Sequence, residues 1–298
     1  MSELRMGIVG ISDGNGHPYS WSAIINGYDP VAMEQCGFPV IPRYLERQQW
    51  PQAHIQGAQV THVWTQDPAV SQSIAQASLI PNVADRLEDL VGKVDAVLLA
   101  RDDASNHLAH AALFLQAGLP IYIDKPIATS RAMLEQLRSL ERYQGQIFTC
   151  SALRYAPQLQ LDTDLRQQLG RLLRVVALTP KAWETYAVHV VEPVTVILGS
   201  DREVELVGTE RSPQGGVTVR LVWGTGIHVE FTATSTDSEV MRIEVVGESG
   251  TVTLAHPDTF SAFKAALQDF VGGIHAGEIR TNWADVERIV DILETGRG

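Results

Sequence analysis

The first half of the chain alternates short apolar runs with segments of helical pattern, and this alternation restricts the possible folds more than any other feature. Apolar runs with the length of buried strands occupy residues 5–11, 60–65, 94–100, 121–124 and 146–150. Between several of them, apolar residues recur at helical spacing, as in 21–28, 108–115 and 133–140. Strands that alternate with helices form βαβ units, in which the strands are parallel. Residues 1–150 are therefore predicted to form an α/β domain around a doubly wound parallel sheet.

After Cys150 the pattern changes to an alternation with a period of two residues. It is clearest in 217–223 and 227–233, on either side of a glycine turn, and predicts an antiparallel hairpin with one apolar face. Further strands are expected at 171–179, 203–209, 241–246 and 251–254, and two amphipathic helices, one from Phe260 and one around Val286, end the chain. Residues 151–298 are therefore predicted to form an α+β domain on an open, mainly antiparallel sheet, with the last helix free to pack back on the first domain.

Net charge and cysteine content limit the kinds of partner and the cellular compartment that are expected for this chain. The net charge of −12 repels a phosphate backbone, and no stretch is dense in Lys and Arg, so nucleic acid and membranes are not expected as partners. No apolar stretch approaches the roughly 20 residues that span a bilayer, and the apolar run after Arg5 is too short for a signal peptide. Cys36 and Cys150 form no metal or disulfide pattern. A cytoplasmic protein with a small-molecule substrate is expected.

The first strand ends in a glycine-rich turn, GIVGISDGNGHP at 7–18, which runs directly into a helix. This arrangement binds dinucleotides in Rossmann-like domains, because unpaired amides and the helix dipole face the pyrophosphate. The fingerprint G-x-G-x-x-G is not met, since Ser12 replaces the second glycine and Asn15 the third. The coenzyme-binding candidates in this turn are Gly10, Ser12, Asp13, Gly14 and Asn15. The alternative is a turn-rich surface loop.

The second strand ends at Thr65, which stands where an acidic residue usually binds the ribose. Thr65 lies 55 positions after Gly10 (65 − 10), so roughly 30 residues, at about 29–59, are inserted relative to the usual spacing of about 20. A threonine tolerates a 2′-phosphate, but no Arg or Lys is adjacent to bind one, so NAD and NADP both remain open. The insertion is either a lid over a cleft or a packed surface excursion.

The sequence IYIDKP at 121–126 places Lys125 at the carboxyl end of a buried strand, the edge where ligands of open α/β sheets bind. It resembles the Glu-Lys-Pro signature of the Gfo/Idh/MocA family of oxidoreductases, with Asp124 replacing the glutamate. Further features of that family follow in order along nearly the whole chain: His107, AGLP at 117–120, RYAP at 154–157, HVVE at 189–192 for the family's His-x-x-Asp, and the Phe-rich helix from Phe260.

The resemblance implies an NAD(P)-dependent oxidoreductase of sugars, cyclitols or related polyols, with a homodimer or homotetramer formed through the C-terminal sheet. It gives Lys125 the contacts to substrate and nicotinamide and His189 the exchange of the substrate proton. The aspartate that the family often has four residues before the histidine is Thr185 here, with Glu184 beside it. The coenzyme contacts expected at the carboxyl edge of the first sheet are Thr65, Ala100, Asp124 and Lys125.

Alcohol oxidation requires a hydride acceptor, a base for the hydroxyl proton and a donor or cation for the developing charge on oxygen. Lys125 can supply the charge and His189 the base, although a solvated lysine and a structural histidine are the alternatives. Pro193 indicates that the helix carrying His189 is kinked or starts near Glu192, which we expect to be a structural anchor. The substrate-lining candidates are His17, Arg154, Trp183, Glu184 and Tyr186. A redox-neutral NAD-assisted lyase or hydrolase and a catalytically silent binding protein are the competing functions.

Overall fold

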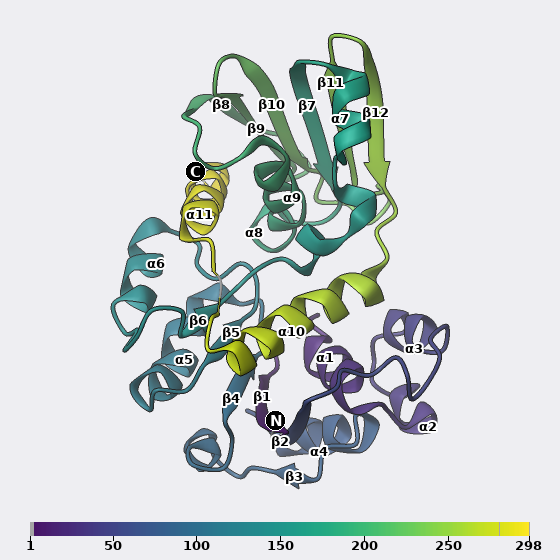
Figure 1. The fold of residues 1–298 in the computed structure, drawn as a ribbon, viewed down its shortest axis with the longest axis vertical. Coiled ribbons are helices and arrows are strands. Elements are labelled where there is room, and N and C mark those ends of the chain that lie inside the picture. Colours follow the sequence, from purple (N-terminus) through teal and green to yellow (C-terminus); the bar gives the residue numbers. More distant parts are fainter. Residues whose placement is uncertain (1–2, 280, 298) are drawn as a thin grey trace. The chain divides into compact units, whose positions relative to one another are not determined.

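The computed structural model describes residues 3–279 and 281–297, and the chain divides into two compact units (Figure 1). The first unit contains residues 1–127, 135–150 and 259–281, and the second contains 128–134, 151–258 and 282–298. The helix that starts near Phe260 thus belongs to the first unit, although it follows the sheet of the second.

A six-stranded sheet forms the centre of the first unit. Its strands are β1 (Leu4–Gly10), β2 (Ala58–Thr65), β3 (Asn82–Val83), β4 (Ala96–Leu99), β5 (Ile121–Ile123) and β6 (Ile147–Phe148). They lie in the order β3-β2-β1-β4-β5-β6, and every pair is parallel. This order is that of a doubly wound dinucleotide fold, so the predicted fold class is confirmed. Strand β3 was not predicted, because a two-residue strand carries no apolar run.

The helices of the first unit include α1 (His17–Asn26), α4 (Pro68–Ala77), the 3-10 turns η1 (Leu87–Leu90) and η2 (Ala104–Asn106), α5 (His107–Gln116) and α10 (Thr259–Ala276). Helix α6 (Arg131–Arg138) begins in the second unit and ends in the first. Aromatic contacts explain why α10 belongs here: the rings of Tyr122 and Phe148 lie 5.7 and 5.6 Å from that of Phe270, and the Phe263 ring lies 6.4 Å from that of Trp21. The phenylalanines of α10 therefore complete the core beside β5, β6 and α1.

The inserted segment after α1 is a packed excursion rather than an open lid. It contains α2 (Pro30–Met33) and α3 (Val40–Leu45), and it buries Met33, Ile41 and Leu45. The Tyr44 hydroxyl donates to Ser20 Oγ on α1 at 2.5 Å. A Cβ on Gly16 would lie 2.7 Å from Ile41 Cδ1, so the excursion packs directly against the glycine-rich turn.

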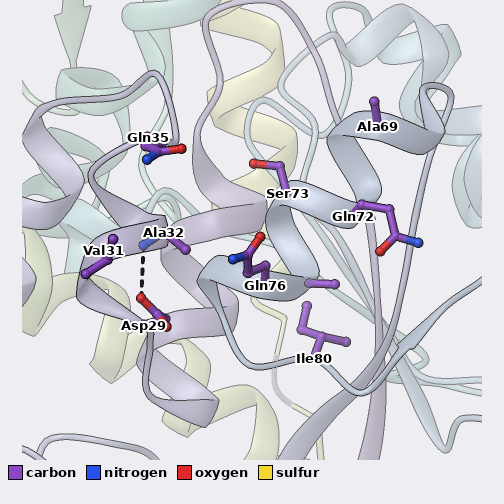
Figure 2. Close-up of a pocket in the computed structure, with 10 residues that line it drawn as sticks. Asp29, Val31, Ala32, Gln35, Ala69, Gln72, Ser73, Gln76 and Ile80 are labelled. Carbon is purple, nitrogen blue, oxygen red and sulfur yellow. Dashed lines mark hydrogen bonds between the residues drawn. The ribbon is translucent and has the colours of Figure 1, made fainter.

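A hollow of about 590 Å³ lies between α2 and α4 (Figure 2). Asp29 caps α2 beside it by accepting a hydrogen bond from the Ala32 amide at 2.9 Å, and Gln35, Gln72 and Gln76 line it. None of the candidate site residues predicted from the sequence lines this hollow.

The second unit is built on a six-stranded sheet of different design. Its strands are β7 (Leu172–Thr179), β8 (Val204–Arg211), β9 (Val217–Trp223), β10 (Ile227–Ala233), β11 (Arg242–Gly247) and β12 (Gly250–Ala255), in the order β12-β11-β7-β10-β9-β8. Only β7 and β10 pair in parallel; the other pairs are antiparallel, as predicted. The β9–β10 hairpin buries its predicted apolar face, including Val219, Leu221 and Trp223.

The helices of this unit are α7 (Thr163–Leu169), α8 (Trp183–Tyr186), α9 (Val188–Leu198) and α11 (Trp283–Arg297), with 3-10 turns η3 (Ala152–Tyr155) and η4 (Pro157–Leu159). The last helix, α11, contacts α8, α9 and β9 and so belongs to the second unit, not to the first. Helix α9 starts at Val188 and runs through Pro193, so it does not start near Glu192, which was one of the two predicted alternatives. Burial of Val190, Val191 and Val194 holds the helix despite the missing proline N–H.

Candidate functional site

The carboxyl ends of β1, β2, β4 and β5 meet at one edge of the first sheet. In the order found here, the crevice between β1 and β4 is the point where the winding reverses, and ligands of such sheets bind outside it. The fold brings to this edge the predicted coenzyme residues, which are Gly10, Ser12, Asp13, Gly14, Asn15, Thr65, Ala100, Asp124 and Lys125.

The turn between β1 and α1 forms a cradle of amides. Within the described residues, the amides of Ser12, Asp13 and Gly14 donate no hydrogen bond to the protein. A Cβ on Gly10 would lie 2.5 Å from Pro18 Cγ, so a side chain there would push α1 away from the turn. Gly14 has a φ of +73°, which favours glycine. Consecutive free amides ahead of a helix start suit a phosphate group, so the turn fits a dinucleotide despite its incomplete fingerprint.

The side chains of Ser12 and Asn15 are used inside the protein. Ser12 Oγ donates to Asp102 Oδ1 at 2.6 Å. Asn15 accepts a hydrogen bond from the His17 amide at 2.8 Å and donates to Asp124 Oδ2 at 3.0 Å. Both residues therefore shape the turn, and only their backbones remain for a ligand.

Lys125 is buried at the end of β5, with 5% of its surface exposed. Its ammonium group lies 3.5 Å from Asp102 Oδ2, on the segment that follows β4. Asp102 is a residue that sequence reasoning missed, because RDD at 101–103 matches no motif and its relation to Lys125 arises only from the pairing of β4 with β5.

Asp124 and His17 form a second buried pair. Asp124 Oδ2 lies 2.5 Å from His17 Nδ1, and the His17 ring stacks on Trp21 with 5.1 Å between centroids. Burial opposes ionisation of Asp124, but the charges of His17 and Lys125 and the hydrogen bonds from His17 and Asn15 outweigh it and hold its pKa below the ordinary value. His17 thus anchors α1 to β5 at this edge.

Thr65 is buried, and its hydroxyl donates to the Asp67 carbonyl at 2.6 Å. The next residue, Gln66, bonds both the amide and the carbonyl of Ile11, at 3.1 and 2.7 Å. Arg101 donates to Gln66 Oε1 at 3.0 Å. A cation thus does lie beside the end of β2, contrary to the prediction from the sequence, because folding places the segment after β4 next to it.

His189 lies in the first turn of α9 in the second unit. Its Nδ1 is 3.1 Å from Ser151 Oγ, and the Tyr186 ring stands edge-on to the imidazole at 5.3 Å. Lys181 donates to the Tyr186 hydroxyl at 2.7 Å. Ser151 and Lys181 were not predicted, and Ser151 provides a hydrogen-bonding partner for His189 where Thr185 replaces the family's aspartate.

Arg154 and Glu192 form an ion-pair group that Ser151 links to His189. Arg154 Nη1 donates to Glu192 Oε1 and its Nη2 to Asp285 Oδ2, each at 3.1 Å, while the Ser151 amide donates to Glu192 Oε2 at 2.6 Å. Complete burial raises the pKa of Glu192 to about 7, although the charge of Arg154 and the bond from Ser151 oppose the rise. Arg154 is thus tied to two carboxylates, and Glu192 anchors the chain as expected.

Glu192 should make the stability of the protein depend on pH. Because its pKa is about 7 in the folded protein against an ordinary 4.5, its contribution is complete below pH 4.5 and is lost as the pH rises to about 7. At about 1.4 kcal/mol per pKa unit, the free energy of unfolding should fall by up to about 3 kcal/mol across this window. Glu192→Gln should abolish that fall, whereas the control Glu184→Gln, at an exposed glutamate, should keep it. Urea unfolding at several pH values measures the free energy of unfolding of the natural protein and the two variants. The same dependence of this free energy on pH in all three proteins would contradict the prediction.

The predicted substrate-lining residues do not all lie at surfaces. Trp183 is buried, its indole N–H donates to the Leu293 carbonyl at 2.9 Å, and a Cβ on Gly296 would come within 2.1 Å of its ring. It is therefore a core residue of the second unit, because α8 turns this side chain toward α11. Glu184 is exposed, while Tyr186 and His189 are half-buried.

Neither a metal centre nor a membrane span appears in the part of the chain that the structure describes. No group of three or more His, Cys, Asp or Glu side chains there is placed to hold a metal ion. None of its helices combines the length and apolar character needed to cross a membrane.

Comparisons with known proteins agree with this geometry. The model of the Gfo/Idh/MocA oxidoreductase family, described as having an NAD-binding Rossmann fold, matches residues 41–151. An inositol 2-dehydrogenase of Acidothermus cellulolyticus is 28% identical over 227 residues, which are 67% of this chain and 66%, just under two thirds, of that protein.

Two solved structures share the fold over nearly the whole chain. Myo-inositol dehydrogenase from Lactobacillus casei, in complex with NAD(H) and myo-inositol, has a TM-score of 0.72 at 15% identity, covering 99% of this chain and 94% of that one. UDP-N-acetylglucosamine 3-dehydrogenase from Acidithiobacillus ferrooxidans has a TM-score of 0.70 at 16% identity, covering 100% and 98%. The chain thus shares the fold of these two dehydrogenases over nearly its whole length, and residues 41–151 match the Gfo/Idh/MocA oxidoreductase model with its NAD-binding Rossmann fold.

Proposed function

We propose that this protein is an NAD-dependent dehydrogenase that exchanges a hydride between the nicotinamide coenzyme and a cyclitol, sugar or related polyol. The observation that carries the proposal is Lys125, a buried ammonium group at the carboxyl end of β5, on the same sheet edge as the amide cradle of Ser12, Asp13 and Gly14. The relative of this chain from Acidothermus cellulolyticus is an inositol 2-dehydrogenase, which supports a cyclitol as the first substrate to test.

Each residue of the proposal has a defined task. The amides of residues 12–14 bind the pyrophosphate, and Lys125 stabilises negative charge on the reacting oxygen. When bound, the coenzyme supplies the acceptor for a hydride, which leaves the alcohol carbon with two electrons. The hydroxyl proton passes to the neutral imidazole of His189, so a secondary alcohol and oxidised coenzyme give a ketone, reduced coenzyme and one proton.

The partner of His189 also favours an enzyme over a silent binding protein. An imidazole needs a hydrogen bond to one ring nitrogen to fix which nitrogen carries the proton. Ser151 Oγ, at 3.1 Å from Nδ1, can supply that bond in place of the missing aspartate. The loss of the carboxylate at position 185 therefore does not by itself argue against proton transfer.

Coenzyme binding is the first test. Titration with NADH, followed by nicotinamide fluorescence, should saturate with the natural protein. Gly14→Pro removes one cradle amide and cannot keep the φ of +73°, so it should abolish the signal. Gly37→Pro is the matched control, because Gly37 also has a positive φ and open space around it but lies in the excursion. No saturable signal up to millimolar NADH or NADPH would refute the proposal, and reduction of NAD over a panel of cyclitols and sugars then identifies the substrate.

We also propose a cytoplasmic homodimer or homotetramer associated through the polar outer face of the second sheet. On this face Arg220 pairs with Glu230 and Glu210 at 2.7 and 2.9 Å. Neither Cys36 nor Cys150, both of which the structure describes, forms a disulfide, which suits a reducing compartment. A single-chain mass by light scattering at micromolar concentration would refute the association.

A further inference from the structure

We infer that Asp102 is the positioning residue for the ammonium group of Lys125, and that Ser12 holds Asp102 in place for this task. The inference deepens the proposed function and rests on it, since it concerns the lysine that acts on the substrate oxygen there. Ser12, which replaces the second glycine of the fingerprint, would then support catalysis by holding Asp102 beside Lys125.

The two oxygens of Asp102 are divided between two partners. Oδ1 accepts a hydrogen bond from Ser12 Oγ at 2.6 Å, and Oδ2 faces Lys125 Nζ at 3.5 Å. Ser12 Oγ in turn accepts a bond from the Asp102 amide at 3.1 Å. The serine hydroxyl thus bonds both the side chain and the backbone of Asp102, which fixes the orientation of the carboxylate. A glycine at position 12 could do neither.

Neighbouring groups keep Asp102 paired with Lys125 rather than with another cation. The nearby cation Arg101 is bound by Asp103, at 2.9 and 2.6 Å, and not by Asp102. The buried ring of His107 bridges the carbonyls of Arg101 and Ile127, at 2.8 and 2.9 Å. It thereby joins the backbone just before Asp102 to the backbone just after Lys125.

The other charged group that acts on Lys125 is Asp124, which comes from the end of β5 itself. Its carboxylate interacts with the charge of Lys125, but Oδ2 is already bonded by His17 of α1 and by Asn15 of the turn, and Oδ1 accepts from the backbone amide of Lys125 at 2.7 Å. Asp102 is therefore the carboxylate whose oxygen faces the ammonium group, and it directs Lys125 at the carboxyl edge of the sheet.

Substitutions at Ser12 test whether this serine positions Asp102 or merely replaces the fingerprint's second glycine without a role of its own. Ser12→Gly restores the fingerprint, yet both it and Ser12→Ala should lower kcat about tenfold or more, the scale of one lost hydrogen bond to a charged group. The Kd for NADH, measured by fluorescence, should change less than kcat. Asp85→Asn, which removes an exposed charge elsewhere on the same unit, is the control and should leave kcat nearly unchanged.

The state of Lys125 can be measured without turnover. The chain has four lysines, at 93, 125, 181 and 264, so competitive acylation of the coenzyme-free protein, read by mass spectrometry, compares Lys125 with three internal references. Asp102→Asn keeps the shape of the carboxylate and removes its charge. Loss of this partner frees the ammonium group from its fixed position, so the acylation rate of Lys125 should rise about tenfold relative to the natural protein, with no change at Lys93.

Three results would overturn the inference. One is an Asp102→Asn protein, folded by its melting curve, in which Lys125 is acylated at the natural rate. Another is a Ser12→Gly protein that binds NADH more tightly and keeps its kcat. The third is a loss of kcat in Asp85→Asn equal to that in Ser12→Ala. If the protein proves not to be a dehydrogenase, the acylation ratio still reports on the Asp102–Lys125 pair, so the two failures are distinguishable.

Discussion

Lys125→Ala is expected to lower kcat by roughly 100-fold or more, the scale for loss of one preorganised donor to a developing oxyanion. The ammonium group is buried at the carboxyl end of β5, where water replaces it poorly. The effect should appear in kcat and in kcat/KM alike, because charge on the oxygen develops only in the transition state. The Kd for NADH should change far less, since the cradle amides belong to the turn after β1.

Lys93→Ala provides the control, since Lys93 is exposed on the same unit. It should keep full activity. Thermal melting verifies that both variants are folded. A Lys125→Ala protein that is folded and turns over the identified substrate at more than a tenth of the natural rate would contradict the role given to this lysine.

His189→Ala is expected to lower the rate of alcohol oxidation by roughly 10²- to 10⁴-fold, the range for removal of a general base. Because only the neutral imidazole accepts the proton, the natural enzyme should lose activity as the pH falls, and this acid limb should be absent from the variant. Steady-state rates across pH test both points. His228→Ala, at an exposed histidine on β10, should leave the rate and the acid limb unchanged.

The alternative for His189 is a structural role. Its Nδ1 contacts Ser151 Oγ, and the Tyr186 ring lies against it. If the imidazole only supports this packing, His189→Ala will melt at a clearly lower temperature and keep its specific activity. That outcome would leave proton transfer to Glu184, Tyr186 or water.

Much of the fold followed from patterns that are local in the sequence. Helical and strand periodicities depend on which side chains share a face, and these are neighbours along the chain. The parallel sheet, the β9–β10 hairpin and the Asp-Lys-Pro strand end were therefore predictable. Helix boundaries near Pro193 were not, because burial of the valines of α9 outweighs the missing hydrogen bond.

The sequence by itself determined the resemblance to Gfo/Idh/MocA oxidoreductases, the fold class and the position of Lys125 at the carboxyl edge of the first sheet. Only the tertiary structure decided which groups surround that lysine. Asp102 is 23 positions from Lys125 and 90 from Ser12, and the three meet because parallel pairing aligns the ends of β1, β4 and β5. The same long-range packing placed α10 with the first unit and Trp183 in a core. Contacts between residues distant in sequence depend on how elements pair and pack, and no local pattern encodes them.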